Sequence, residues 1–344
     1  MYLFAARLYR KNYLRLLFVV MMIANLPSIG LRAQSRGSSA TPSARVDLRT
    51  RLVPGQVLRY QVQLQTVTDT HRSGAVSDPE GPSRLTVTWG STIKVEVLRA
   101  ASTSAPAANP AAEPLRVRTT YEHSAATVSG DSPDPESQRL EQTYKRLEGQ
   151  VIEFTAHPDG HVSDVHGLEG IIDDDKVRQS AEQWIAQVSA PAMSGQGVAI
   201  GQTWNSAQPA DSIPIAGMIW RSNSSYVRNE SCRPAEANEP DSPGEMCAVI
   251  ITRQSVVPGK KRRDPTPEDY RRNGLKTSGQ WSGSGESLSY ISLRTHLAVS
   301  VTQDSSQKID FTVTNSAGRS IRYAGTIDTH SRVALLQSQT DGLP

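Results

Sequence analysis

Strict alternation of apolar and polar residues is the dominant pattern in this chain. It is clearest over 57–64, where the sequence reads Val-Leu-Arg-Tyr-Gln-Val-Gln-Leu, and it recurs over 85–89, 93–97 and 115–121. A period of two places one apolar and one polar face on a strand, as in an antiparallel sheet with one face toward water. Further strands are predicted in the second half, over 218–220, 225–227, 247–252, 288–293, 297–302, 309–314, 321–327 and 333–336.

Tight turns separate several of these strands. Pro158-Asp159-Gly160 and Ser316-Ala317-Gly318 both combine residues that favour reversals of the chain. Short connections of this kind join strands that are neighbours in an antiparallel sheet. The fold class predicted is therefore mainly β, built from antiparallel meander sheets.

Two segments follow the helical period instead. The first is a short amphipathic helix marked by Leu140, Tyr144 and Leu147. The second is one central amphipathic helix, about 174–189, preceded by three aspartates that can cap its start and followed by Pro191. We expect this central helix to pack on the sheet through one apolar stripe, formed by Val177, Ala181, Trp184, Ile185 and Val188.

The chain divides into two β-rich halves, 44–190 with the central helix at its end, and 191–340. Residues 53–58 resemble 199–204, and the predicted hairpin 153–164 resembles 289–299. These similarities suggest a duplicated unit. Chance similarity between strands rich in Thr and Val is the alternative.

The N-terminus has the layout of a secretory signal. A basic region with Arg7, Arg10, Lys11 and Arg15 precedes an apolar run over 16–26. Spanning a bilayer takes about 20 residues, so a run of this length favours a cleaved signal over an uncleaved anchor. We predict a signal peptide over 1–33, a disordered linker over 34–43, and a periplasmic or secreted protein with no transmembrane segment after cleavage.

Signal cleavage changes the charge of the chain. The full sequence has 37 basic and 34 acidic residues, a net charge of +3. Residues 1–33 hold five of the basic residues and no acidic one, which leaves 32 basic against 34 acidic residues, a net charge of −2. This balance gives no reason to expect nucleic acid as a partner.

The two cysteines, Cys232 and Cys247, bracket a polar loop between two predicted strands. An exported protein meets an oxidising compartment, so we expect a disulfide bond that closes a hairpin. Two unpaired, buried thiols are the alternative.

Several turn-and-strand motifs resemble one family. They are Gly55-Gln56 with Tyr60, the hairpin over 154–162, Val165-His166-Gly167-Leu168, and the segment over 198–204 that ends in Gly201-Gln202-Thr203-Trp204. Together they resemble an uncharacterised family of exported bacterial proteins, a domain of unknown function, over about residues 50–302. The resemblance implies a β-rich fold and a location in the cell envelope, and it carries no catalytic residue to this chain.

No catalytic or cofactor motif occurs in the sequence. There is no G-x-S-x-G, H-E-x-x-H, paired C-x-x-C or complete G-x-G-x-x-G. We therefore predict no catalytic residue, metal or cofactor, and a protein that is not an enzyme.

Three charged clusters have a functional and a simpler interpretation. His157, His161 and His166, with Asp159 and Asp164, could bind zinc or could be a solvated hairpin. The run 173–175 could bind calcium or cap the central helix. The basic loop 258–274, with its four basic residues at 260–263 followed by Arg271 and Arg272, could bind an anion or lipid headgroup or could be solvated.

Tryptophans supply the one candidate binding site. A curved antiparallel sheet closed by a helix can enclose an apolar pocket, and the residues predicted to line it are Trp184, Ile185, Val188, Trp204 and Trp220. The alternative is that these side chains fill the core. The leading hypothesis for function is non-enzymatic binding of an apolar or envelope-derived ligand, such as an envelope lipid. A structural or protein-interaction role in the envelope is the second, and a hydrolase with an unrecognised site is the third.

Overall fold

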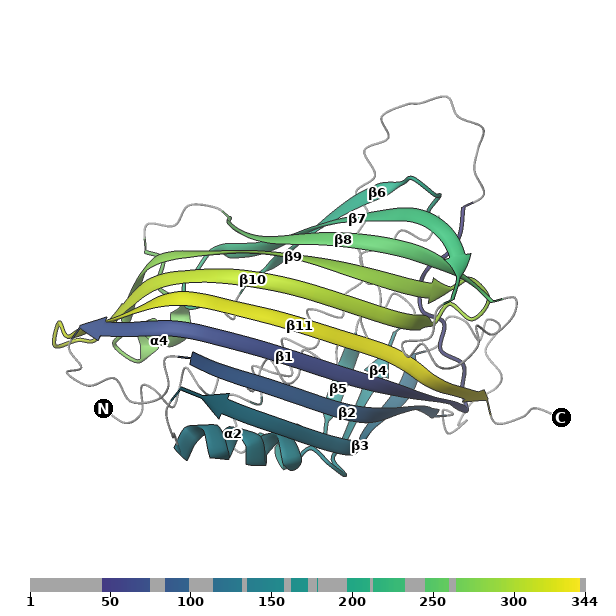
Figure 1. The fold of residues 1–344 in the computed structure, drawn as a ribbon, viewed down its shortest axis with the longest axis horizontal. Helices are drawn as coiled ribbons and strands as arrows, with labels where there is room; N and C mark the ends of the chain where they lie inside the picture. The colour runs from purple at the N-terminus through teal and green to yellow at the C-terminus, as the bar shows by residue number, and fades with distance from the viewer. Residues whose placement is uncertain are drawn as a thin grey trace.

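A single antiparallel sheet of 11 strands makes up most of the molecule (Figure 1). The computed structural model describes residues 45–74, 84–98, 114–131, 135–157, 162–172, 178, 197–210, 213–232, 245–259 and 264–340. The prediction of a mainly β protein with antiparallel meander strands is confirmed. The central helix predicted at 174–189 lies outside the described residues, except for Arg178.

The order of strands across the sheet is β5-β4-β3-β2-β1-β11-β10-β9-β8-β7-β6. The first half of the chain therefore forms one meander and the second half another, and the two join where β1 pairs with β11 from Gln56 to Gly74. The strands are β1 (Gln56–Gly74), β2 (Arg84–Leu98), β3 (Leu115–Gly130), β4 (Val151–Ala156), β5 (Val162–His166), β6 (Thr203–Pro209), β7 (Met218–Ser231), β8 (Met246–Pro258), β9 (Lys276–Ser292), β10 (Ala298–Thr314) and β11 (Ser320–Thr340).

The strands are longer than the alternation of apolar residues predicted. Two predicted strands, 85–89 and 93–97, are parts of one strand, β2, which continues through Gly90. The same holds for 297–302 and 309–314, which the polar stretch between them joins into β10. The backbone pairing of β10 with its neighbours continues through this polar stretch, so the ladder persists where the apolar pattern stops.

Helix α2 (Pro135–Lys145) confirms the short helix predicted there, and Leu140, Tyr144 and Leu147 are all buried. The indole of Trp89 donates a hydrogen bond of 2.8 Å to the hydroxyl of Ser124, which donates one of 2.6 Å to the carbonyl of Tyr144.

The predicted basic loop 258–274 contains a second short helix, α4 (Glu268–Arg272), and a 3-10 turn, η2 (Leu168–Gly170), follows β5. Arg271 and Arg272 of α4 both bind Glu268 of the same helix.

The sheet is curved (Figure 1). Three clusters of buried apolar side chains lie on the same face of it, which we call the inner face. The largest lies over β1 to β4 beneath α2. A second lies beside α4 at the end of the sheet where β1 ends, and a third lies over β6 to β9 near their opposite ends. No helix in the described part of the chain is both long enough and apolar enough to cross a membrane.

Candidate ligand-binding site

The inner face changes in character along the strands. Its middle carries small and polar side chains in one row across the second meander, formed by Ser222, Gln254, Gly285, Ser305 and Thr329. These five residues are half-buried, although they face inward. Apolar side chains gather on either side of this row, toward the two ends of the sheet. Over the second meander, the inner face therefore offers two apolar regions separated by this row of residues, which we call the polar belt.

At the end beside α4 the apolar region is aromatic. We call Trp220, Trp281, Phe311 and Tyr323 the aromatic patch. The ring centroids of Phe311 and Tyr323 lie 5.1 Å apart in a stacked arrangement, and those of Trp281 and Phe311 lie 5.8 Å apart. The indole N–H of Trp281 donates to the amide oxygen of Gln307 at 3.0 Å. Since this hydrogen bond satisfies its polar edge, the ring offers an apolar surface.

The aromatic patch differs from other aromatic residues of the inner face in one respect. Trp89, Trp204, Tyr121 and Tyr226 are each at most 1% exposed. Within the patch only Phe311 is buried, while Trp220, Trp281 and Tyr323 keep part of their surface open. Large aromatic side chains that stay partly exposed on an inward-facing surface are available for contact with a ligand.

The structure separates two of the residues predicted to share one pocket. Trp204 lies in the core cluster near the start of β6, packed with Tyr226, Ile250 and Ile291. Trp220, on the adjacent strand, packs against the cluster beside α4 instead. Trp184, Ile185 and Val188 lie outside the described residues.

Sequence reasoning missed Trp281, Phe311 and Tyr323. A hairpin centred on the predicted turn at 316–318 places Phe311 directly opposite Tyr323, as the structure shows. That pairing was therefore available from the sequence. Trp281 gave no such signal, because it stands in a stretch of Ser, Gly and Gln without apolar alternation.

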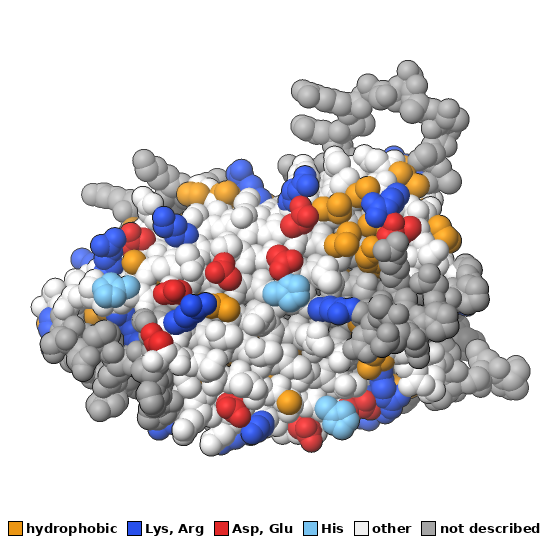
Figure 2. Space-filling model, viewed as in Figure 1, with side chains coloured by type: hydrophobic (Ala, Val, Ile, Leu, Met, Phe, Trp, Pro, Cys, Tyr) orange, Lys and Arg blue, Asp and Glu red, His pale blue; other side chains and the backbone are white. Residues whose placement is uncertain are grey.

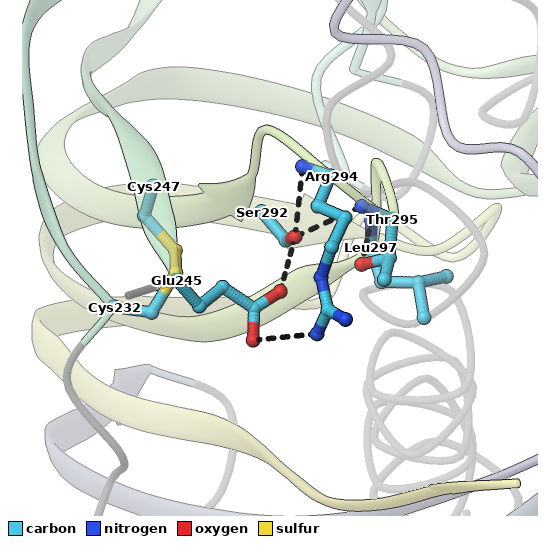
Figure 3. Close-up of a disulfide and its surroundings, with 7 residues drawn as sticks. All are labelled: Cys232, Glu245, Cys247, Ser292, Arg294, Thr295 and Leu297. Carbon is cyan, nitrogen blue, oxygen red and sulfur yellow. Dashed lines mark hydrogen bonds and ion pairs between the residues drawn. A yellow bond between two sulfur atoms is a disulfide. The ribbon is translucent and has the colours of Figure 1, made fainter. Parts of the chain in front are cut away.

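The predicted disulfide bond is present. Cys232 and Cys247 join the end of β7 to the start of β8, with Cα atoms 4.9 Å apart (Figure 3). Beside it, Glu245 accepts a hydrogen bond of 2.5 Å from Ser292 and forms an ion pair of 3.4 Å with Arg294. These contacts fix the start of β8 against the end of β9.

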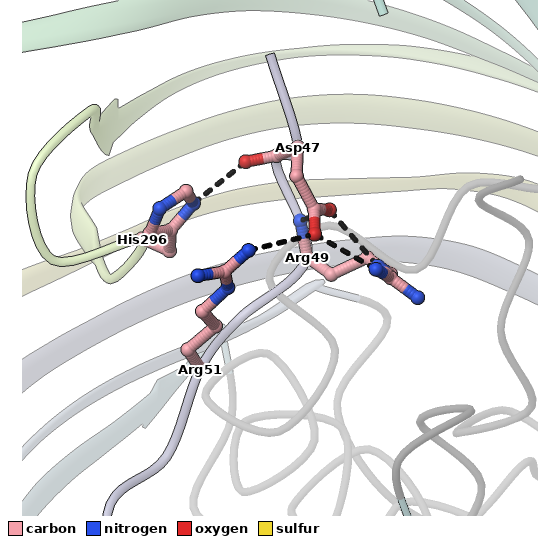
Figure 4. Close-up of polar contacts among 4 residues, drawn as sticks. All are labelled: Asp47, Arg49, Arg51 and His296. Atoms are coloured by element: carbon pink, nitrogen blue, oxygen red, sulfur yellow. Dashed lines mark hydrogen bonds and ion pairs between the residues drawn. The ribbon is translucent and has the colours of Figure 1, made fainter. Parts of the chain in front are cut away.

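The segment before β1 crosses the inner face at the same end. Leu48 is buried in the cluster with Trp204, and Val46 forms a β-bridge with Val198. The carboxylate of Asp47 binds the guanidinium groups of Arg49 and Arg51, and its backbone carbonyl contacts the ring of His296 at 2.6 Å (Figure 4). Hydrogen bonds from Arg49 hold the pKa of Asp47 well below its ordinary value. The two arginines stabilise the conformation of this segment, and the contact with His296 together with the bridge to Val198 ties it to the rest of the fold.

The outer face is polar in its middle and carries a shallow groove of about 590 Å³. Two cross-strand ion pairs line the groove, Arg253 with Glu286 at 2.9 Å and Asp304 with His330 at 2.7 Å. All four side chains are more than half exposed, so each pair contributes little to stability. None of the described residues that line the groove is Phe, Tyr or Trp, and the groove is therefore a weaker candidate for an apolar ligand than the aromatic patch.

An apolar patch lies on the outer face near the disulfide bond. Ile251 and Leu288 are paired across β8 and β9, Val249 and Tyr290 form the next outward-facing pair, and Figure 2 shows apolar side chains gathered over this end of the sheet. Val249 is fully buried, and we call the half-buried Ile251, Leu288 and Tyr290 the outer patch. It is bordered by the pairs Arg228 with Glu230 and Arg253 with Glu286.

The predicted histidine cluster gives no catalytic geometry. Nε2 of His157 lies 2.9 Å from the hydroxyl of Ser163, but that hydroxyl donates its hydrogen to Asp164 at 2.9 Å. In a nucleophilic triad the histidine accepts the serine proton, and the carboxylate binds the histidine. Here the carboxylate binds the serine instead, so the three side chains do not form a triad. Among the described residues no three His, Cys, Asp or Glu side chains form a group that could hold a metal ion. His161, Asp159 and the acidic run 173–175 lie outside those residues.

No protein-family model matches the sequence, and no curated protein is similar to it. Among solved structures, one on lipid–protein interactions in lipovitellin is similar over 86% of this chain and 26% of that chain, with 10% identity and a TM-score of 0.40. An outer membrane channel from Pseudomonas putida F1 is similar over 83% of this chain and 97% of that chain, with 9% identity and a TM-score of 0.18. At these scores neither structure carries an argument about function.

Proposed function

We propose that this chain is an exported, non-enzymatic binding protein that holds an apolar ligand against the aromatic patch of its inner face. The partial exposure of Trp281 and Tyr323, beside the full burial of comparable rings elsewhere on the same face, is the observation that carries the proposal. Covering apolar surface releases about 25 cal/mol for each Å² removed from water. A ligand lying on these rings would therefore gain affinity from contact area alone, without a catalytic group.

The disulfide bond supports the cellular location in this proposal. Such bonds form and persist in oxidising compartments outside the cytosol. The bond is therefore consistent with export, and the signal peptide at 1–33 stays a prediction, because those residues lie outside the described part of the chain.

The test is uptake of N-phenyl-1-naphthylamine, a neutral probe that fluoresces in apolar surroundings, by protein expressed from the full chain and recovered after export. We expect saturable binding, weakened about tenfold or more by Trp281→Ala, since the indole supplies contact area to the probe. Stability should fall by only about 1–2 kcal/mol, less than for a fully buried tryptophan. Probe fluorescence and a denaturant titration on the same sample measure both quantities.

Trp281→Phe is the matched control, because it keeps an aromatic ring at the same place on β9. It should retain most of the binding that Trp281→Ala loses. A native protein that takes up no probe, or a Trp281→Ala variant that binds it as tightly as the native protein, would refute the proposed function.

Self-association through the outer patch is the second candidate function. The patch is bordered by side chains of both charges, Arg228 with Glu230 and Arg253 with Glu286. A second copy related by a twofold axis presents the same patch, and each arginine can then face a glutamate of its partner. This arrangement suits a structural component of the envelope.

Sedimentation velocity over a range of concentrations tests the second candidate. We expect a dimer for the native protein and a monomer for Ile251→Lys, which places a charge in the centre of the outer patch. Ser282→Lys adds the same charge on the outer side of β9, away from the patch, and should leave the dimer intact. A native protein that is monomeric at all concentrations removes this candidate and leaves ligand binding unaffected.

A further inference from the structure

One arginine stands at the border of the aromatic patch. Arg72 lies near the end of β1 directly opposite Tyr323 of β11, and the same row continues across the sheet to Phe311. Side chains that are directly opposite in an antiparallel pair lie on the same side of the sheet. Arg72 therefore belongs to the inner face together with the aromatic patch, and it is half-buried there.

The guanidinium of Arg72 has no acceptor within the described chain, in contrast to three other strand arginines that bind a carboxylate. Arg59 binds Glu122 at 3.0 Å, Arg118 binds Glu153 at 2.8 Å and Arg322 binds Asp310 at 2.7 Å. No ion pair or hydrogen bond joins the Arg72 side chain to any part of the chain that the structure describes. A half-buried charge without a partner is costly, and an anion from outside the chain would offset that cost.

The acidic residues of the neighbouring strands cannot supply this partner, because they alternate to the other face. Asp69 precedes Arg72 by three positions, and an odd separation along a strand places two side chains on opposite faces. Asp310 pairs with Ala324, one row away from the row of Tyr323 and Arg72, and it therefore also faces outward. Asp310 is already bound to Arg322 on the outer face. Within the described residues, the inner face at this end of the sheet thus combines a positive charge that no carboxylate neutralises with an apolar surface.

Tyr323 adds a hydrogen-bond donor next to this charge. Burial raises the pKa of its hydroxyl, and the nearby charge of Arg72 partly opposes that rise. The hydroxyl accordingly keeps its proton at neutral pH. The ring of Tyr323 is stacked on Phe311, and the residue is paired with Arg72 across β1 and β11.

We propose that the ligand of the aromatic patch is an amphipathic anion, an alkyl chain with a carboxylate or phosphate headgroup, and that Arg72 binds the headgroup while the chain lies on Trp281 and Phe311. This inference rests on the proposed function and names its ligand class. Guanidinium forms paired, charge-assisted hydrogen bonds with both kinds of headgroup, and the Tyr323 hydroxyl can donate a further one. The polar belt of Gln254, Ser305 and Thr329 limits the apolar surface on the other side, so the site suits a single chain of limited length.

The experiment measures displacement of N-phenyl-1-naphthylamine by three compounds with the same ten-carbon chain: decanoate, decyl phosphate and 1-decanol. We expect the native protein to bind at least one of the anions about tenfold more tightly than the alcohol, as one additional charge-assisted contact provides. Arg72→Gln should remove this preference while the affinities for 1-decanol and for the probe stay unchanged. Arg72→Lys should keep part of it, because the charge remains but the paired geometry is lost.

Arg322→Gln is the control, since it removes the same charge one strand away on the outer face, where Asp310 already holds it. It should leave all three affinities unchanged. Selective binding of decanoate identifies a carboxylate headgroup, and selective binding of decyl phosphate identifies a phosphate ester.

The outcomes separate this inference from the proposed function on which it rests. If the probe and 1-decanol bind but the anions bind no more tightly, or if Arg72→Gln keeps the preference, the ligand is neutral and the inference is wrong while the proposed function stands. If neither the probe nor any of the three compounds binds, both are wrong.

Discussion

Replacing Trp204 by alanine is expected to lower the free energy of unfolding by about 3–5 kcal/mol, the usual cost of emptying a fully packed tryptophan site. The side chain is 1% exposed and packs with Tyr226, Ile250 and Ile291, all of them buried. Its loss would leave a cavity between β6 and β8 that rigid strands cannot collapse to fill. Guanidinium titration followed by far-UV circular dichroism measures the change.

Trp204→Phe separates the packing of this residue from its polar group. The indole N–H of Trp204 is buried and has no hydrogen-bond partner within the described structure. A buried donor without a partner costs about 1–3 kcal/mol, and phenylalanine removes that donor while it fills most of the space. We therefore expect Trp204→Phe to cost far less than Trp204→Ala, under about 1.5 kcal/mol.

The same pair of variants decides between core packing and ligand contact at this position. A core residue should change stability and leave uptake of N-phenyl-1-naphthylamine by the aromatic patch as it is. A Trp204→Ala variant of native stability that has lost probe binding would place the ligand here instead, as the sequence suggested.

Apolar residues at every second position predicted the strands that cover an apolar core. Strand segments whose inward-facing side chains are polar lack this alternation, and they were not predicted. In β9 the stretch from Ser282 to Ser287 consists of Ser, Gly and Glu, and it pairs with an equally polar stretch of β10. Its inward-facing positions are Gly283, Gly285 and Ser287, at or beside the polar belt, so no apolar residue recurs at every second position. The backbone ladder continues through it because hydrogen bonds between strands do not depend on side-chain polarity.

The pairing of β1 with β11 could not be predicted from local pattern. All the other strands lie between the end of β1 at Gly74 and the start of β11 at Ser320 in the sequence. A turn or hairpin signal identifies only neighbours along the sequence. What joins the two meanders is the register in which Tyr60, Val62 and Leu64 face the inner side together with Val333. This long-range contact also brings Arg72 beside Tyr323, which explains why no sequence pattern indicated that Arg72 borders the aromatic patch.

Removing the disulfide bond by replacing both Cys232 and Cys247 with alanine is expected to lower the free energy of unfolding by about 3 kcal/mol. The two cysteines are 15 residues apart, and closing a loop of that length restricts the unfolded chain by about this amount. Changing both residues avoids leaving one unpaired thiol, since Cys247 is fully buried. A denaturant titration of oxidised native protein against the double variant gives the difference.

Reduction of the native protein is the matched control for this last variant. Dithiothreitol should lower the midpoint of native unfolding toward that of the double variant and should leave the midpoint of the variant itself unchanged. Hydrogen exchange should quicken mainly at the end of β7 and the start of β8, where Glu245, Ser292 and Arg294 hold the strands beside the bond. If full reduction, verified by thiol titration, leaves the native midpoint where it was, the bond does not stabilise the fold, and the contacts of Glu245 suffice to hold this end of the sheet together.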